Sequence, residues 1–123
     1  MSIKTILVVE DNALNMKLVK SLLKIGEYDM VEAPDAETGI TFARNKKPDL
    51  ILMDIQLPGM DGLTATRTIK EDPSVKDIPI VAFTSFAMEG DEEKAMEAGC
   101  AGYITKPLNT QNFLKTVESY LRE

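Results

Sequence analysis

Several short runs of strand character in this chain end in side chains that can do chemistry. Glu10 and Asp11 follow the apolar run 5–9, and Asp54 follows the run 50–53. Thr84 and Lys106 follow the runs 78–83 and 101–105. Carboxylates without histidine or thiolate suit a hard cation, Mg²⁺ above all. An Asp beside Mg²⁺ is a competent nucleophile toward phosphorus, and an ammonium and a hydroxyl can stabilise the charge on a transferred phosphoryl group.

Each of these residues also has a simpler interpretation when it is taken alone. Asp54 could cap the turn after it, and Asp11 could cap a helix. Thr84 could be a turn hydroxyl, and Lys106 could be a solvated charge. Chance would rarely place all of them at the carboxyl ends of strands, so the set as a whole predicts a site.

The elements that would position these residues alternate strictly between strand and helix. We predict strands over 5–9, 28–33, 50–53, 78–83 and 101–105, with a helix after each of them. This alternation predicts an α/β fold: a doubly wound, five-stranded parallel sheet with helices on both faces, flavodoxin-like, in the order 2-1-3-4-5. The order reverses between the strands that end in Asp11 and Asp54. All the strand-end residues would then meet at one rim of the sheet.

Helical periodicity predicts which side of each helix is buried. The first helix ends at Gly26, the third lies near 63–71, and Asp35 and Asn109 serve as N-caps of the second and last helices. The strand 28–33 carries alternating charges, which favours an edge position. The predicted buried residues are Leu14, Leu18, Leu22 and Ile25; Ala36, Ile40 and Ala43; Leu63, Ala65 and Ile69; and Phe113, Val117 and Leu121.

The bulk properties of the chain limit its functions. Its 123 residues, of which 44% are hydrophobic, suit a single domain over 1–123. A net charge of -6 argues against direct binding to nucleic acid or anionic lipid. One cysteine and no histidine exclude an internal disulfide and the usual zinc sites. There is no signal peptide and no run of membrane-spanning length, so we expect a soluble cytoplasmic protein.

The residue types present argue against two phosphate-binding functions. A flavin mononucleotide site would need a Ser/Thr/Gly loop after the first strand, whereas residues 10–15 read Glu-Asp-Asn-Ala-Leu-Asn and would repel a phosphate. A Walker-type glycine-lysine loop does not occur in the sequence, which argues against nucleotide hydrolysis.

Residues 4–122 resemble the receiver domain of bacterial two-component response regulators. The stretches that carry the resemblance are 8–12 (Val-Val-Glu-Asp-Asn), 52–62 (Leu-Met-Asp-Ile-Gln-Leu-Pro-Gly-Met-Asp-Gly), 82–85 (Ala-Phe-Thr-Ser) and 102–107 (Gly-Tyr-Ile-Thr-Lys-Pro). The stretch 86–93 also looks like that of stand-alone, DivK-like receivers and of receivers fused to hybrid kinases.

The resemblance implies a phosphoacceptor signalling protein. Asp54 would receive a phosphoryl group from a phosphohistidine on a histidine kinase or phosphotransfer protein. Asp11, Asp54 and the backbone carbonyl of Gln56 would hold Mg²⁺, with Glu10 acting through water. Such a protein is not an enzyme in the usual sense, although it assists its own phosphorylation and slow dephosphorylation.

The resemblance also implies which residues contact the phosphoryl group and how its presence changes the protein surface. Thr84 and Lys106 would contact the phosphoryl oxygens, and the Lys106–Pro107 bond would be cis. Movement of Thr84 would let Tyr103 turn inward, remodelling the face of the fourth helix, fifth strand and fifth helix where a downstream protein binds. By its residue type alone, Tyr103 would be a partly buried aromatic with a hydrated hydroxyl. Ser85 and Phe86 depart from the residues usual in the family, and Phe86 would lie near the line of water attack. We therefore hypothesise that Phe86 and Gln56 shape the phosphoryl lifetime by limiting or orienting that water.

Three alternatives stay open at this point. The chain could be a receiver excised from a hybrid kinase or a larger regulator. It could be a small Mg²⁺-dependent phosphohydrolase that forms an aspartyl phosphate, although haloacid-dehalogenase-like phosphatases have a second Asp where this chain has Gln56. It could also be a pseudo-receiver that binds partners without phosphorylation, although all five strand-end residues are present.

Overall fold

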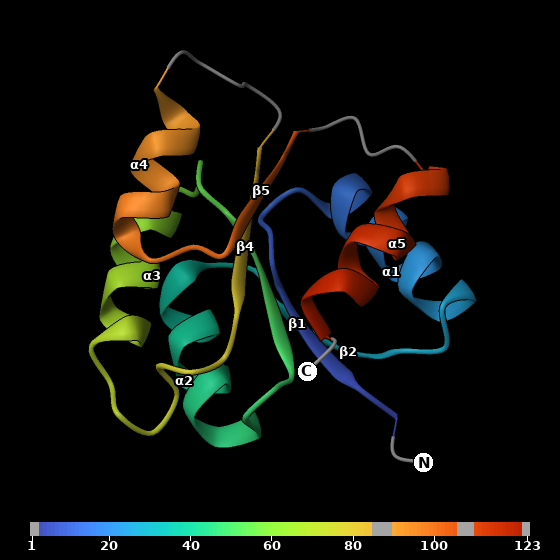
Figure 1. The fold of residues 1–123 in the computed structure, drawn as a ribbon, viewed down its shortest axis with the longest axis horizontal. Helices are drawn as coiled ribbons and strands as arrows, with labels where there is room; N and C mark the ends of the chain where they lie inside the picture. Colours follow the sequence, from blue (N-terminus) through green and yellow to red (C-terminus); the bar gives the residue numbers. More distant parts are fainter. Residues whose placement is uncertain (1–2, 85–89, 106–109, 122–123) are drawn as a thin grey trace.

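The structure, a computed structural model, describes residues 3–84, 90–105 and 110–121, with the side chains of 110 and 111 left out. Five strands alternate with five helices along the chain (Figure 1). In order they are β1 (Thr5–Val9), α1 (Ala13–Ile25), β2 (Asp29–Ala33), α2 (Ala36–Lys46), β3 (Leu50–Asp54), α3 (Gly62–Lys70), β4 (Ile80–Thr84), α4 (Asp91–Ala98), β5 (Gly102–Thr105) and α5 (Thr110–Leu121).

The sheet confirms the predicted topology. Its strands are all parallel and follow the order β2-β1-β3-β4-β5, with β2 at an edge as predicted. The register pairs Val9 with Met53 and Asp54 with Phe83, so the carboxyl ends of β1, β3 and β4 lie at one edge of the sheet. The main boundary difference is in β4, which begins at Ile80 rather than at residue 78.

Two hydrophobic cores lie on opposite faces of the sheet. Figure 1 shows α2, α3 and α4 on one side and α1 and α5 on the other. Alternate strand residues serve the two faces: Leu7, Ile51 and Ala82 join the core under α2–α4, whereas Val8 and Leu52 join the core under α1 and α5. Strands that are buried on both faces become continuous apolar runs, which explains the runs seen in the sequence.

The prediction for the buried side of α1 is wrong. The helix buries Met16, Val19, Leu22 and Leu23, so Leu22 is the one residue of the predicted set that is buried. Leu14, Leu18 and Ile25 are 77%, 39% and 71% exposed. The helix carries two apolar stripes, both at helical spacing, and the sheet covers the one that begins at Met16.

The other helices agree more closely with the sequence. The predicted faces of α2 and α3 are buried except for Leu63, which is half-buried, and in α5 Phe113 and Val117 are buried while Leu121 is half-buried. Asp35 caps α2 as predicted, since its carboxylate accepts a hydrogen bond from the Thr38 N–H at 2.7 Å. The predicted cap Asn109 lies outside the described residues. Across the described ranges, every helix is too short or too polar to cross a bilayer.

Candidate functional site

Three carboxylates meet at the carboxyl edge of the sheet. Glu10 and Asp11 follow β1, and Asp54 ends β3, the strand paired with β1 through Val9 and Met53. One carboxylate oxygen from each side chain lies within 4.8 Å of one from each of the others. Glu10 and Asp54 are buried, at 2% and 5% exposed, whereas Asp11 is exposed. The site therefore combines two buried acids with one that reaches solvent.

Backbone N–H groups hold two of these acids in place. Asp54 Oδ1 accepts a hydrogen bond from the Gln56 N–H at 2.9 Å, so this carboxylate also caps the turn after it. Glu10 Oε2 accepts from the Asn12 N–H at 3.3 Å. The simpler interpretation of Asp11 as a helix cap is wrong, because Asn12 is the N-cap of α1 and accepts from the N–H groups of Leu14 and Asn15.

This donor set fits a small, hard divalent cation. All three side chains offer oxygen, which is the ligand type that Mg²⁺ prefers. Three negative charges this close together repel one another, and a shared cation would relieve that repulsion. Gln56 lies two residues beyond Asp54 in the loop that leaves the sheet here, and its side chain is exposed while its neighbours Ile55 and Leu57 are buried.

Thr84 and Tyr103 lie on the next two strands, β4 and β5. Thr84 ends β4, is fully buried, and pairs with Thr105, the last residue of β5. Tyr103 pairs with Ala82 earlier along the same two strands and packs against the core under α2–α4. The structure thus brings Glu10, Asp11, Asp54 and Thr84 to one edge, as the sequence predicted.

The hydroxyl of Tyr103 is buried rather than hydrated, contrary to the interpretation from residue type alone. Within the described ranges it has no hydrogen-bond partner. Burial raises the pKa of this hydroxyl above its ordinary value of 10.0, and the Asp91 and Glu92 carboxylates of α4 raise it further. The half-buried ring of Tyr103 therefore packs against the core under α2–α4, with its hydroxyl buried.

Three residues of the predicted site cannot be placed. Lys106, Pro107 and Phe86 lie outside the described residues. Sequence reasoning also missed contributors that the structure reveals. Asn12 fixes the start of α1 beside the carboxylates, a role that its position before an apolar helix could have suggested. Gly62 contacts the backbone of Asp54, and nothing in the sequence signals this contact.

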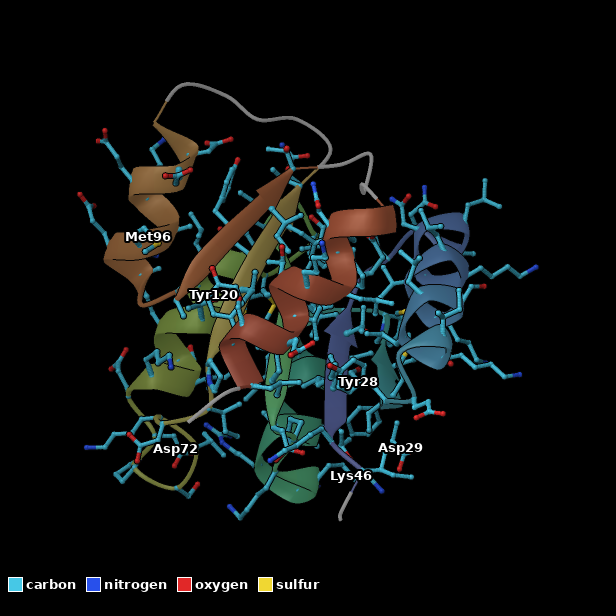
Figure 2. All side chains as sticks on the ribbon, turned by 45° about the vertical axis from the view of Figure 1, so that its right-hand side comes forward. Tyr28, Asp29, Lys46, Asp72, Met96 and Tyr120 are labelled. Atoms are coloured by element: carbon cyan, nitrogen blue, oxygen red, sulfur yellow. The ribbon has the colours of Figure 1, made fainter. Side chains whose placement is uncertain are left out.

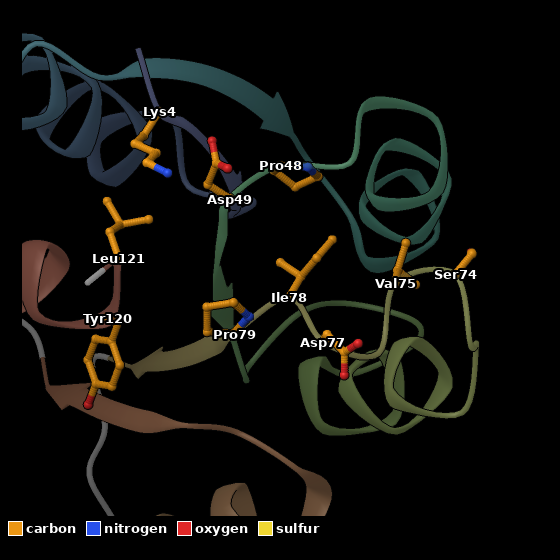
Figure 3. A pocket seen from close by; sticks show the side chains of 10 residues that line it. All are labelled: Lys4, Pro48, Asp49, Ser74, Val75, Asp77, Ile78, Pro79, Tyr120 and Leu121. Atoms are coloured by element: carbon orange, nitrogen blue, oxygen red, sulfur yellow. The ribbon is translucent and has the colours of Figure 1, made fainter. Parts of the chain in front are cut away.

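A separate hollow of about 480 Å³ lies at the opposite, amino edge of the sheet (Figure 3). It is bounded by the start of β1, the turn before β3, the loop before β4 and the end of α5. Its lining residues are Lys4, Pro48, Asp49, Ser74, Val75, Asp77, Ile78, Pro79, Tyr120 and Leu121. Because parallel strands separate this edge from Asp54, the hollow is not part of the carboxylate site.

Comparison with known proteins agrees with this geometry. The family model described as the response regulator receiver domain matches residues 6–118. The polar-differentiation response regulator DivK of Brucella anthropi is 44% identical over 118 residues, which cover 96% of each chain.

Solved structures give the same result. A putative response regulator from Chloroflexus aurantiacus superposes with a TM-score of 0.93 at 26% identity, covering 98% of both chains. The receiver domain of the sensor histidine kinase PA1611 from Pseudomonas aeruginosa, solved with a magnesium ion coordinated in its active site cleft, superposes with a TM-score of 0.90 at 31% identity, also covering 98% of both. The chain therefore belongs to the response regulator receiver domain family of two-component signalling proteins.

Proposed function

We propose that this receiver accepts a phosphoryl group on Asp54 in a Mg²⁺-dependent reaction, from a phosphohistidine on a histidine kinase or phosphotransfer protein. The observation that carries the proposal is the cluster of Glu10, Asp11 and Asp54, with carboxylate oxygens within 4.8 Å of one another. The family assignment supports it, because it makes signalling rather than substrate turnover the expected role.

In the transfer, an oxygen of the Asp54 carboxylate forms a bond to phosphorus. The bond between phosphorus and the donor imidazole nitrogen breaks, and its electron pair leaves with the imidazole. The Gln56 N–H orients the carboxylate through its bond to Oδ1. The Thr84 hydroxyl and the Lys106 ammonium would contact the phosphoryl oxygens, where charge develops.

The chain's own oxygens would hold the metal. Asp11, Asp54 and the Gln56 carbonyl would be its protein ligands, with Glu10 acting through water. When bound, Mg²⁺ supplies positive charge that offsets both the carboxylates and the phosphoryl oxygens. The magnesium ion in the PA1611 receiver supports this assignment.

The signal would leave through the face formed by α4, β5 and α5. A shift of Thr84 toward the phosphoryl group would change the space beside Tyr103, whose ring packs against the core that includes Ala95 of α4. Met96 lies on α4 and is 48% exposed, so α4 offers an apolar contact to a downstream protein (Figure 2).

The donor protein would dock on α1. The exposed Leu14 and Leu18 begin a stripe immediately after the carboxylates, and Lys17, Lys20 and Lys24 lie exposed along the same helix. An apolar stripe beside lysines suits a protein surface that carries apolar and acidic groups. Replacing both leucines with alanine should slow transfer from a protein donor and leave phosphorylation by acetyl phosphate unchanged.

Intact mass after incubation with acetyl phosphate tests the proposed chemistry. We expect a gain of one phosphoryl group that requires Mg²⁺ and is absent in Asp54→Ala. Asp29→Ala, an exposed edge-strand carboxylate, is the matched control and should behave as wild type. No gain with several donors would contradict the proposal in favour of a pseudo-receiver, and steady phosphate release would favour a hydrolase.

Decay of the phosphorylated protein tests the lifetime residues. Phe86→Ala and Gln56→Ala should each change the first-order loss of the phosphoryl group, because both would admit or reorient attacking water. Unchanged decay in both variants would contradict this part of the proposal.

A further inference from the structure

The first residue of α3 touches the backbone of the phosphoacceptor. Gly62 is buried, and a Cβ atom placed on it would overlap the Asp54 carbonyl oxygen and lie 2.7 Å from Ile55 Cα and 2.9 Å from the Asp54 carbonyl carbon. These neighbours are backbone atoms, which cannot turn aside as a flexible side chain can. The contact therefore exists only because residue 62 has no side chain.

Two hydrogen bonds within α3 brace its first turn, and the buried side of the helix fixes its position in the core. Thr66 is fully buried, and its hydroxyl donates a hydrogen bond to the Gly62 carbonyl at 2.8 Å. Asp61 caps the same turn by accepting from the Thr64 N–H at 2.8 Å. Ala65 and Ile69 are also fully buried in the core. The helix consequently has little freedom to move away if the contact at Gly62 is disturbed.

The contact lies at the point where the chain leaves the sheet. Up to Asp54 the backbone is fixed by pairing with β4, through Phe83. Beyond it the loop carries Gln56, whose N–H bonds to Asp54 Oδ1 at 2.9 Å. A methyl group at residue 62 would displace Asp54 and Ile55 and so alter this hydrogen bond.

We propose that Gly62 and Thr66 are positioning residues for the phosphoacceptor: close approach of α3 at Gly62, secured by the Thr66 hydroxyl, fixes the Asp54 carboxylate and the Gln56 backbone. Neither residue touches the transferred group, and both act through Asp54 and Gln56. The effect of this positioning on phosphorylation rests on the proposed function. The positioning itself can be measured in the metal-free protein.

The test compares four variants with wild type. Gly62→Ala removes the close approach, Thr66→Val removes the hydroxyl at similar size, and Thr66→Ser retains it. Gly26→Ala is the matched control, because its methyl group would meet the side chains of Leu114 and Tyr28 at 2.8 Å, far from Asp54 along α1. Two properties are measured: hydrogen exchange of the Gln56 amide without metal, and the Mg²⁺ midpoint from amide chemical shifts.

We expect Gly62→Ala to raise the Mg²⁺ midpoint by about tenfold or more, since changes in the groups that orient metal ligands typically cost about 10–100-fold in affinity. The same variant should speed exchange of the Gln56 amide. Thr66→Val should change both in the same direction, whereas Thr66→Ser and Gly26→Ala should match wild type. Wild-type exchange and midpoint in Gly62→Ala would overturn the inference. If Gly62→Ala does not fold, equal values for Thr66→Val and Thr66→Ser would overturn it.

The two proposals fail in different ways. Absence of phosphorylation in wild type would contradict the proposed function, while the exchange of the Gln56 amide would still decide the positioning. Normal phosphorylation together with unchanged exchange in the Gly62 and Thr66 variants would leave the function intact and remove the positioning role.

Discussion

Neutralising Asp54 should stabilise the metal-free protein even though it abolishes the proposed chemistry. Two unit charges 4.8 Å apart repel by about 3.5 kcal/mol at an effective dielectric constant of about 20. Asp11 is exposed, so solvent screens part of this repulsion, and Asp54 also makes other interactions. We therefore expect Asp54→Asn, which can still accept the Gln56 hydrogen bond, to raise the free energy of unfolding by about 2 kcal/mol.

Thermal unfolding with and without Mg²⁺ measures this effect. For a domain of 123 residues, about 2 kcal/mol corresponds to a rise of about 8 °C in the melting temperature without divalent ions. Mg²⁺ should stabilise wild type by preferential binding to the folded state and stabilise Asp54→Asn much less. Asp29→Asn removes the same charge from an exposed edge position and controls for net charge. If Asp54→Asn melts at or below the wild-type temperature, or responds equally to Mg²⁺, the reasoning about carboxylate repulsion is wrong.

Three further predictions concern stability. Tyr103→Phe removes a buried hydroxyl that has no partner in the described part of the chain. Chemical denaturation should therefore show a free energy of unfolding that is unchanged or higher by up to about 1 kcal/mol. A loss of more than about 1 kcal/mol would contradict this expectation. Lys47 has a φ of 45°, a left-handed conformation that strains any residue with a side chain. In the same assay, Lys47→Gly should therefore raise the free energy of unfolding by about 0.5–1 kcal/mol. A lower free energy of unfolding would show that no strain is relieved. Hydrogen bonds from Ser74, then Arg44, lower the pKa of Asp72 below its ordinary 3.8. The contribution of Asp72 to the free energy of unfolding is therefore present above pH 3.8 and is lost as the pH falls through the pKa of the folded state. In Asp72→Asn, the free energy of unfolding should fall less steeply over this acid range.

The fold could be predicted because its signals are local and repeated. Each buried strand is a short apolar run, each helix begins or ends at a recognisable residue such as Asp35 or Gly99, and alternation with right-handed crossovers permits few topologies. The buried side of α1 could not be predicted, since Leu14, Leu18, Leu22 and Ile25 have the same helical spacing as the stripe that is buried. Only contact with the sheet distinguishes the two stripes.

The candidate site was predictable to the extent that topology alone determines it. Glu10, Asp11, Asp54 and Thr84 meet because parallel strands in the order 2-1-3-4-5 deliver their carboxyl ends to one edge. The close approach at Gly62 was not predictable, because it depends on the path of the loop after β3 and on the packing of α3. A glycine in a turn-rich stretch gives no indication of which backbone it touches.

In the proposed reaction, Asp54 itself carries the phosphoryl group. Borohydride reduction of the protein after incubation with a phosphodonor and Mg²⁺, with peptide mass mapping of the product, tests this most directly, because reduction of an aspartyl phosphate leaves homoserine at that position. We predict homoserine at position 54 in the Mg²⁺-treated sample and unchanged aspartate when Mg²⁺ is withheld. Homoserine in place of a different aspartate would contradict the claim. A gain in mass on phosphorylation with no homoserine at any position would also contradict it.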